Sequence, residues 1–324
     1  MAINSKKNAL VSVVDSIFVV GGEMIEKNGE DSYAYSLNDK YGFIGVFDGC
    51  GGIGSRKYDS FENKTGAFIS SHTSANLMLE WFNLFTKHGY ELSSDSMNSV
   101  CSSMKENLEN ELRKYDSVAG TTALKGSLTK NFPTTASMVL FSGDKSKMQA
   151  LYIWAGDSRG FMLTKGGLIQ ITRDDIEDDG DALQNLSNDS KLTNMVCADG
   201  SFHLNGRMVN APESGIMITA TDGFFGYFST PMEFEYMLLD TLMASESIAQ
   251  WKDKLNDYIR KYTADDYTMC VAVYGYKSVR ALKKVYAPRM DMLYKKYISG
   301  LPGLGDEARI HLWNDYKKDY YRGD

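Results

Sequence analysis

The chain has 324 residues, of which 43% are hydrophobic and 24% charged, so it can bury a core without disulfides or metals to hold it together. The formal net charge of −7 argues against nucleic acid as the main partner, because phosphate binding needs clustered lysine and arginine. No apolar run approaches the roughly 18 residues that a membrane span needs, so no membrane association is expected.

The N-terminal segment and the cysteines bear on the cellular location of the protein. Residues 9–20 are apolar but are interrupted by Ser12 and Asp15, and no small-residue cleavage site follows, which favours a β-strand over a signal peptide. The four cysteines have neither C-x-x-C nor zinc-site spacing. Free thiols are typical of a reducing compartment, so we expect a cytoplasmic location.

The first half of the chain predicts strands, then two helices, then strands again. Apolar residues recur at steps of three and four in two segments, which predicts helices at about 63–87 and 95–115 that each bury one face. Runs rich in Val, Ile, Phe and Tyr predict strands, at 10–20, 32–37, 41–47, 136–141, 148–154, 160–164 and 168–171.

The second half is more varied. Residues 174–212 are polar, begin with an acidic run and predict a loop-rich, flap-like insertion. Beyond it we expect a strand at 215–221, helices at 230–239 (opened by a capping box) and 248–261, and a last strand at 267–276.

The C-terminal residues 277–324 form a basic extension. They contain 11 Lys and Arg against 6 Asp and Glu, a net charge of +5, and their composition is helical with breaks expected at Pro288 and at 300–305. This extension either docks on the acidic body or on an acidic partner, or it is a solvated helical tail.

The order of these elements indicates the fold class. Strict alternation of strand and helix is absent, and a dinucleotide-binding fold needs βαβ units with a parallel sheet. The order favours an α+β protein, in which helices cover mostly antiparallel strands.

A glycine-rich stretch, "GFIGVFDGCGGIGS", follows the third predicted strand. Gly49, Gly51 and Gly54 match the G-x-G-x-x-G pattern of a pyrophosphate-binding loop, but alone that pattern is weak evidence. Asp48 ends the strand directly before the first glycine. We therefore interpret the stretch as a turn that directs a carboxylate away from the end of a sheet.

Acidic residues recur where predicted strands meet turns. Converging carboxylates repel one another and raise one another's pKa, and a hard divalent cation removes that cost. All-oxygen ligands suit magnesium or manganese. Two such ions about 3.5–4 Å apart would activate a water that attacks phosphorus without a protein nucleophile. The acidic residues in question are Glu30, Asp31, Asp48, Asp157, Asp222 and Asp265.

Six segments in one order carry a family resemblance. They are "EDSYAY", "GVFDGCGG", "TTASMVLF", "YIWAGDSRGFML" with "LIQITRDD" after it, "ITATDGFF" and "DDYTMCVAV", and they span residues 30–276. Together they make the chain similar to the metal-dependent type 2C protein phosphatases, which hydrolyse phosphoserine and phosphothreonine. The resemblance implies an αββα sandwich, two central sheets flanked by helices, with two Mn²⁺ or Mg²⁺ ions at one end.

The resemblance also assigns roles to residues of this chain. It makes Asp48, Asp222 and Asp265 the catalytic carboxylates around a water or hydroxide that bridges the two ions, with Asp48 in contact with both. It implies further metal contacts from the acidic pair and a backbone carbonyl, and a third, more labile ion beside one more aspartate: Glu30, Asp31, Gly49 and, for the third ion, Asp157.

Four positions depart from the family pattern. Glu26 stands where an arginine often grips the substrate phosphate, and Lys27 beside it is a candidate substitute without the bidentate fork. Cys50 stands where many members have a histidine that protonates the leaving oxygen, which makes it a second candidate contact to the substrate phosphate. Gly226 replaces an aspartate that often supports the third metal, and Asp266 replaces a frequent asparagine.

These observations predict a type 2C phosphatase-like catalytic domain at 1–276, containing the flap-like insertion 174–212, followed by the basic extension 277–324. The expected function is hydrolysis of phosphoproteins. A catalytically weak pseudophosphatase that binds a partner through the extension is the main alternative. A nicotinamide-dependent enzyme, which rests on the glycine pattern alone, is the third.

Overall fold

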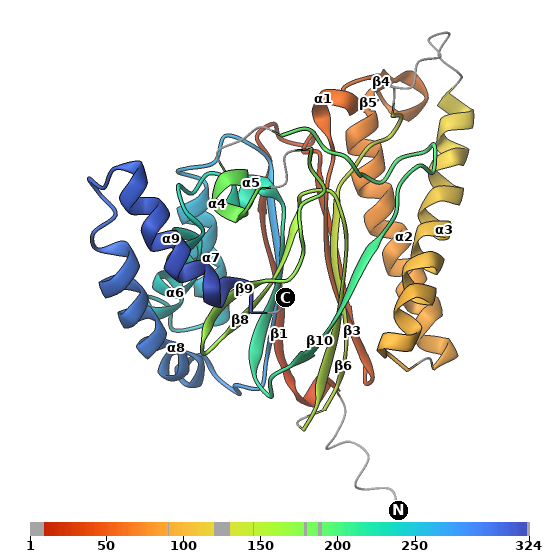
Figure 1. Ribbon diagram of the computed structural model, residues 1–324. Coiled ribbons are helices and arrows are strands. Elements are labelled where there is room, and N and C mark those ends of the chain that lie inside the picture. The colour runs from red at the N-terminus through yellow and green to blue at the C-terminus, as the bar shows by residue number, and fades with distance from the viewer. Residues whose placement is uncertain are drawn as a thin grey trace, which may run out of the picture.

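The computed structural model describes residues 10–89, 91–119, 130–144, 146–177, 180–186 and 190–322. Two five-stranded sheets pack face to face, and helices cover their outer faces (Figure 1). The first sheet has the order β1 (Val14–Gly22), β12 (Tyr267–Tyr274), β11 (Gly215–Ala220), β8 (Arg159–Thr164) and β9 (Gly167–Gln170). The second has the order β10 (Asn205–Ala211), β7 (Met148–Ala155), β6 (Ala136–Gly143), β3 (Tyr41–Asp48) and β2 (Asp31–Leu37).

Neighbouring strands in both sheets run antiparallel, as does the small ribbon of β4 (Lys57–Tyr58) and β5 (Lys64–Thr65). The outer face of the second sheet is covered by α2 (Gly66–His88) and α3 (Ser94–Ala119). The first sheet is covered by α6 (Pro231–Met243), α7 (Ile248–Ile259), α8 (Val279–Leu293) and α9 (Asp306–Tyr320). The expected α+β sandwich of two antiparallel sheets between helices is confirmed.

Short helices and turns complete the chain. One-turn helices are α1 (Gly51–Gly54), α4 (Ala182–Asn185) and α5 (Asp222–Phe225). Short 3₁₀ turns lie at Leu10–Ser12 and Asp59–Phe61, and a π-helical turn at Tyr294–Ile298 follows α8. Across the described residues, no helix has both the length and the apolar character that crossing a membrane would require.

Each central strand has two buried faces, and this explains the apolar runs in the sequence. In β3, Phe43 and Phe47 face the helices while Ile44 and Val46 face the other sheet. In β12, alternate residues likewise enter the helix-side core and the core between the sheets. Side chains alternate between faces along a strand, so a strand buried on both sides reads as a continuous apolar run.

Two expectations for the second half of the chain are wrong. Part of the loop-rich segment 174–212 is strand β10, which pairs with β7 without a break from Asn205 opposite Trp154 to Ala211 opposite Met148. Its residues are mostly half-buried at the sheet edge, so it lacks a strong apolar pattern. The expected break at Pro288 is also absent, because α8 continues through it with Tyr286 and Arg289 buried on either side. Their packing offsets the hydrogen bond that proline removes.

Candidate metal centre

Strand ends from both sheets meet at one end of the sandwich. Asp48 ends β3 and lies opposite Asp31, which opens β2. In the first sheet the start of β8, the end of β11 and the start of β12 are neighbours, with Arg159 beside Ala220 and Ala220 beside Met269. The turns at this edge carry the predicted aspartates of the first sheet: Asp157, Asp222 and Asp265.

Hydrogen bonds across the two sheets fix these turns. The Thr221 hydroxyl donates to Asp31 Oδ2 over 2.9 Å, and the Thr268 backbone N–H donates to the same hydroxyl oxygen over 2.9 Å. The Asp266 carboxylate accepts the backbone N–H groups of Met24 at 2.6 Å and Glu30 at 2.7 Å. The first sheet therefore holds both members of the predicted acidic pair in place.

The glycine after Asp48 is required by close packing. The Gly49 N–H donates to the Glu30 carbonyl over 3.1 Å. A Cβ at position 49 would lie 2.7 Å from the Ala67 carbonyl oxygen and 2.8 Å from the Glu30 carbonyl oxygen. A Cβ at Gly51 would meet the Glu30 carboxylate. The glycines thus serve a tight turn around carboxylates, and the antiparallel strands here lack the βαβ unit of a dinucleotide site.

The carboxyl groups perturb one another strongly. Burial raises the pKa of Asp157 to about 8, and the charge of Asp222 contributes further. Burial also raises the pKa of Asp31 to about 8, against the hydrogen bond from Thr221. The pKa of Asp48 is well above its ordinary value because of burial and the charges of Asp222 and Asp31.

The pKa values of Glu30 and Asp265, two further carboxyl groups of the cluster, are also raised. Burial raises the pKa of Glu30, while a hydrogen bond from the Thr65 hydroxyl opposes the change. Burial and the charge of Asp222 raise the pKa of Asp265. Ionising all of these groups together requires a compensating positive charge.

The donor set fits a hard divalent cation in its chemistry. The side chains offer oxygen alone, which suits magnesium or manganese. As the side chains stand, no three His, Cys, Asp or Glu residues in the described ranges are close enough together to hold an ion. Binding an ion would therefore require these carboxylates to rotate toward one another.

Two cavities adjoin this cluster and meet at Asp265. One has a volume of about 400 Å³ and is lined by Asp157, Asp222 and Asp265 together with residues of the 174–212 segment. The other, of about 410 Å³, has Glu30, Asp265 and Asp266 in its wall together with Lys57 and Lys64.

The two predicted contacts to substrate phosphate lie in different settings. Lys27 has a left-handed backbone (φ 65°), and 87% of its side chain is exposed, 4.0 Å from the Glu26 carboxylate. Lys64 holds this loop through the Lys27 carbonyl and, over 3.0 Å, through the Asn28 side chain. Cys50 is partly buried beside Asp48, and burial and then the charge of Asp48 raise the pKa of its thiol well above the ordinary value.

Gly226, which stands where the family pattern has an aspartate, ends helix α5. The Gly226 N–H donates to the Asp222 carbonyl over 2.5 Å, and Gly226 lines the 400 Å³ cavity without a carboxylate. This part of the cavity therefore lacks the extra oxygen ligand that the family pattern places there.

Sequence reasoning missed the polar contacts made by the residues on either side of Asp157. Arg159, two positions on, makes a buried two-point pair with Asp174 at 2.9 and 2.6 Å. Burial alone would lower the pKa of Arg159, but the Asp174 carboxylate raises it. Asp175 accepts the N–H of Gly156, which has a φ of 97°, over 3.0 Å. The pair could have been anticipated from the sequence, because Arg159 lies in an apolar strand and a buried arginine needs an acidic partner.

Comparison with solved structures agrees with this geometry. No family model and no curated protein matches the sequence. The catalytic domain of the serine/threonine protein phosphatase PstP in complex with two manganese ions superposes with a TM-score of 0.54 at 17% identity, covering 81% of this chain and 99% of that one.

Two further solved structures superpose in the same way. Serine/threonine phosphatase Stp1 from Staphylococcus aureus gives a TM-score of 0.58 at 15% identity, covering 80% of this chain and 93% of that one. PppA, described as a key regulatory component of the type VI secretion system in Pseudomonas aeruginosa, gives 0.52 at 17% identity, covering 81% and 99%. This chain therefore has the fold of the bacterial serine/threonine phosphatases, which confirms at the level of fold its resemblance to the type 2C family.

Proposed function

We propose that this protein is a metal-dependent phosphatase that hydrolyses phosphoserine and phosphothreonine in proteins. The observation that carries the proposal is the meeting of carboxylates from both sheets at one end, where burial and mutual repulsion raise their pKa values. Such a cluster needs cations to ionise fully, and it adjoins a cavity of about 400 Å³ that is open to a substrate side chain.

The carboxylates would hold two Mn²⁺ or Mg²⁺ ions, with Asp48 between them. Asp222 and Asp265 would complete one site, and the other metal contacts would come from Glu30, Asp31 and the Gly49 carbonyl. When bound, such ions lower the pKa of water toward neutrality and neutralise phosphoryl oxygens. Asp157 is the candidate for a third, weaker ion.

The chain's own residues would carry out the remaining steps. Threonine hydroxyls and backbone N–H groups orient the carboxylates, as the bond from Thr221 to Asp31 illustrates. Cys50 is a candidate contact to the substrate phosphate, and the raised pKa of its thiol makes it a poor proton donor to the leaving oxygen, because an effective general acid has a pKa near the working pH. Lys27 is the candidate that attracts the substrate phosphate from its exposed loop.

We further propose that residues 1–276 form the catalytic domain and that 277–324 is an extension that docks on it. Contacts from α9 and from Tyr321, which follows it, to residues of the 174–212 segment support this docking. We place the protein in the cytoplasm with phosphoproteins as substrates. The second candidate is a pseudophosphatase, favoured by Gly226, which offers no carboxylate to the cavity.

The decisive experiment is hydrolysis of a phosphothreonine peptide by the purified chain with Mn²⁺, with Mg²⁺ and with a chelator. We expect metal-dependent activity that is lost in Asp48→Asn and in Asp222→Asn. Glu106→Gln on the exposed face of α3 is the matched control, since it also removes one carboxylate charge. A folded wild-type protein that is inactive with either metal would favour the pseudophosphatase.

A further inference from the structure

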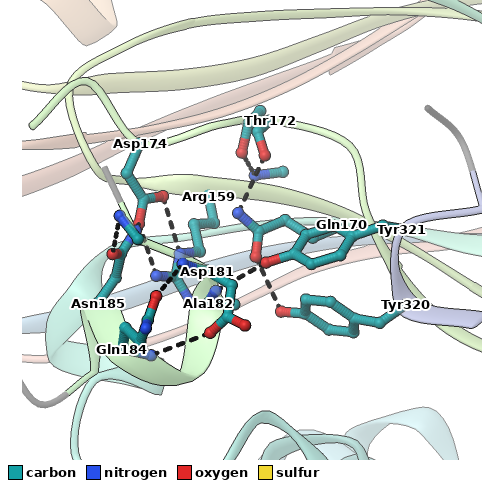
Figure 2. A network of polar contacts seen from close by, with 12 residues as sticks. Arg159, Gln170, Thr172, Asp174, Asp181, Ala182, Gln184, Asn185, Tyr320 and Tyr321 are labelled. Carbon is teal, nitrogen blue, oxygen red and sulfur yellow. Dashed lines mark hydrogen bonds and ion pairs between the residues drawn. The ribbon is translucent and has the colours of Figure 1, made fainter. Parts of the chain in front are cut away.

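The C-terminal helix α9 contacts a short segment beside the candidate site. We call residues 174–177 and 180–186 the flap segment. Its Asp181 carboxylate accepts a hydrogen bond from the Trp313 indole N–H over 2.7 Å and pairs with Lys317 at 3.1 Å. The Ala182 backbone N–H donates to the Tyr321 hydroxyl oxygen over 2.7 Å (Figure 2). Three side chains at the end of the chain thus hold two adjacent flap residues.

Helix α9 is itself fixed in the core. The Arg289 guanidinium pairs with both oxygens of Glu235 at 2.7 Å, and the Tyr316 hydroxyl donates to the same carboxylate over 2.5 Å. All three side chains are buried, as is Trp313. The Tyr320 hydroxyl also donates to Gln170 of β9 over 2.9 Å (Figure 2). A helix held this way gives the flap segment a rigid support.

The flap segment leads directly to the carboxylate cluster. Asp174 pairs with Arg159, and the Asn185 amide donates to Asp174 Oδ2 over 2.9 Å (Figure 2). Arg159 follows Asp157 by two residues, and its guanidinium lies 4.5 Å from the centre of the Phe225 ring. Asn185 belongs to α4, the same one-turn helix whose first residue, Ala182, contacts Tyr321.

Helix α4 is not stable by itself. It has four residues, and a single helical turn is unstable in water because the conformational entropy lost in forming it exceeds the stabilisation that its hydrogen bonds provide. Asp181 caps it by accepting the Gln184 N–H over 3.2 Å, while the Gln184 side chain accepts the Asp181 N–H over 2.9 Å. The carboxylate that caps α4 is therefore the one that α9 holds.

The flap segment forms one wall of the 400 Å³ cavity. Ile176, Asn185 and Leu186 line it together with Asp157 and Asp222. A phosphate group alone would reach the carboxylates without this wall, whereas the residues beside a phosphorylated side chain would contact it. The position of α4 should consequently matter for a peptide and not for a small phosphate ester.

We propose that α9 positions the flap segment as the wall that binds the peptide part of the substrate. Trp313, Lys317 and Tyr321 are then positioning residues, which act through Asp181 and Ala182. This inference rests on the proposed phosphatase function, because it concerns the substrate of that same site. The contact is a permanent support and not an inhibitory cover.

The test variant is the double substitution Lys317→Ala/Tyr321→Phe, which removes two flap contacts and leaves Trp313 in the core. The matched control is Tyr297→Phe/Lys318→Ala, which removes two contacts of the same extension to Asp315 instead. Both are assayed with a phosphothreonine peptide and with para-nitrophenyl phosphate. Hydrogen–deuterium exchange of residues 180–186 is measured in parallel.

We expect the test variant to raise KM for the peptide about threefold to tenfold, which is what the loss of one net hydrogen bond predicts. The kcat of the test variant for the peptide and its kinetic constants for para-nitrophenyl phosphate should stay within about twofold of wild type. All kinetic constants of the control variant should do the same. Hydrogen–deuterium exchange at 180–186 should accelerate only in the test variant. An unchanged peptide KM, an equal loss on both substrates, or a gain in activity would each overturn the proposal. If the wild type hydrolyses neither substrate, the proposed function fails. Unchanged hydrogen–deuterium exchange at 180–186 in the test variant would independently refute the claim that α9 positions the flap segment.

Discussion

Replacing Asp48 by asparagine should stabilise the metal-free protein while abolishing its response to metal. The substitution keeps the shape of the side chain and its contact with Asp222 but removes a charge from the centre of the cluster. An acid whose pKa is raised on folding costs stability once it ionises. The unfolded chain releases that proton near pH 4, so the stability of the folded state falls as pH rises from about 4 toward 8.

The size of the effect follows from the pKa values of its neighbours. Asp31 and Asp157 shift from 3.8 to about 8. At pH 7.5 such a shift corresponds to an upper limit of about 5 kcal/mol, at about 1.4 kcal/mol per pKa unit. Protonation of one carboxyl relieves the others, so we expect Asp48→Asn to recover about 1–3 kcal/mol. In a chain of this length that raises the Tm by about 2–5 °C.

The assay is thermal unfolding at pH 4.5, 6 and 7.5, with chelator and with Mn²⁺. Wild type with chelator should lose stability as pH rises, and Mn²⁺ should restore it most at pH 7.5, by about 2.7 kcal/mol at a hundredfold excess over Kd. Asp48→Asn should be more stable than wild type in chelator at pH 7.5, nearly equal at pH 4.5, and unchanged by Mn²⁺. Glu106→Gln should behave as wild type. A destabilised Asp48→Asn, or one that still responds to Mn²⁺, would refute the reasoning.

Three further predictions concern residues around the cluster. Asp174→Asn leaves the buried Arg159 charge without its partner, so urea unfolding should show a loss of about 3–5 kcal/mol, and a loss below about 1 kcal/mol would contradict the role of the pair. Lys27→Ala should raise KM for a phosphopeptide about twofold to fivefold at unchanged kcat, as expected for an exposed charge that attracts phosphate; an unchanged KM would remove Lys27 from the site. Because burial raises the pKa of the Cys50 thiol, Cys50→Ser should leave the peroxide sensitivity of the activity unchanged; a loss of sensitivity would mean that the thiolate forms beside bound metal.

The sequence predicted the fold through periodicity and element order. Stripes at steps of three and four predicted α2 and α3, and the absence of β-α alternation predicted antiparallel sheets, which the structure confirms. The places of Asp48, Asp157 and Asp222 at strand ends were also visible, because a strand followed by glycine or a turn has a recognisable pattern. Local signals sufficed for these features.

Features that depend on residues far apart in the sequence could not be predicted from local sequence patterns. The pairing of Arg159 with Asp174 depends on the path of the segment between them, which no local propensity determines. Strand β10 is formed because β7 offers an edge, not because its own residues are strongly apolar. Pro288 stays helical because tertiary packing outweighs its intrinsic preference. The role of Asp266 as acceptor for two loop N–H groups likewise appears only when the chain is folded.

The carboxylates and the wall of the cavity are held by different parts of the molecule. Asp31 and Asp48 belong to strands paired on long registers, and Asp222 lies two residues beyond the end of β11, so their positions change only if a sheet is disrupted. The flap segment has a single helical turn and is held by the pairing of its Asp174 with Arg159 on one side and by α9 on the other. Substitutions in the first group should therefore lower kcat for every substrate, while those in the second should change KM for peptides. This separation would let the extension alter substrate preference without altering the chemistry.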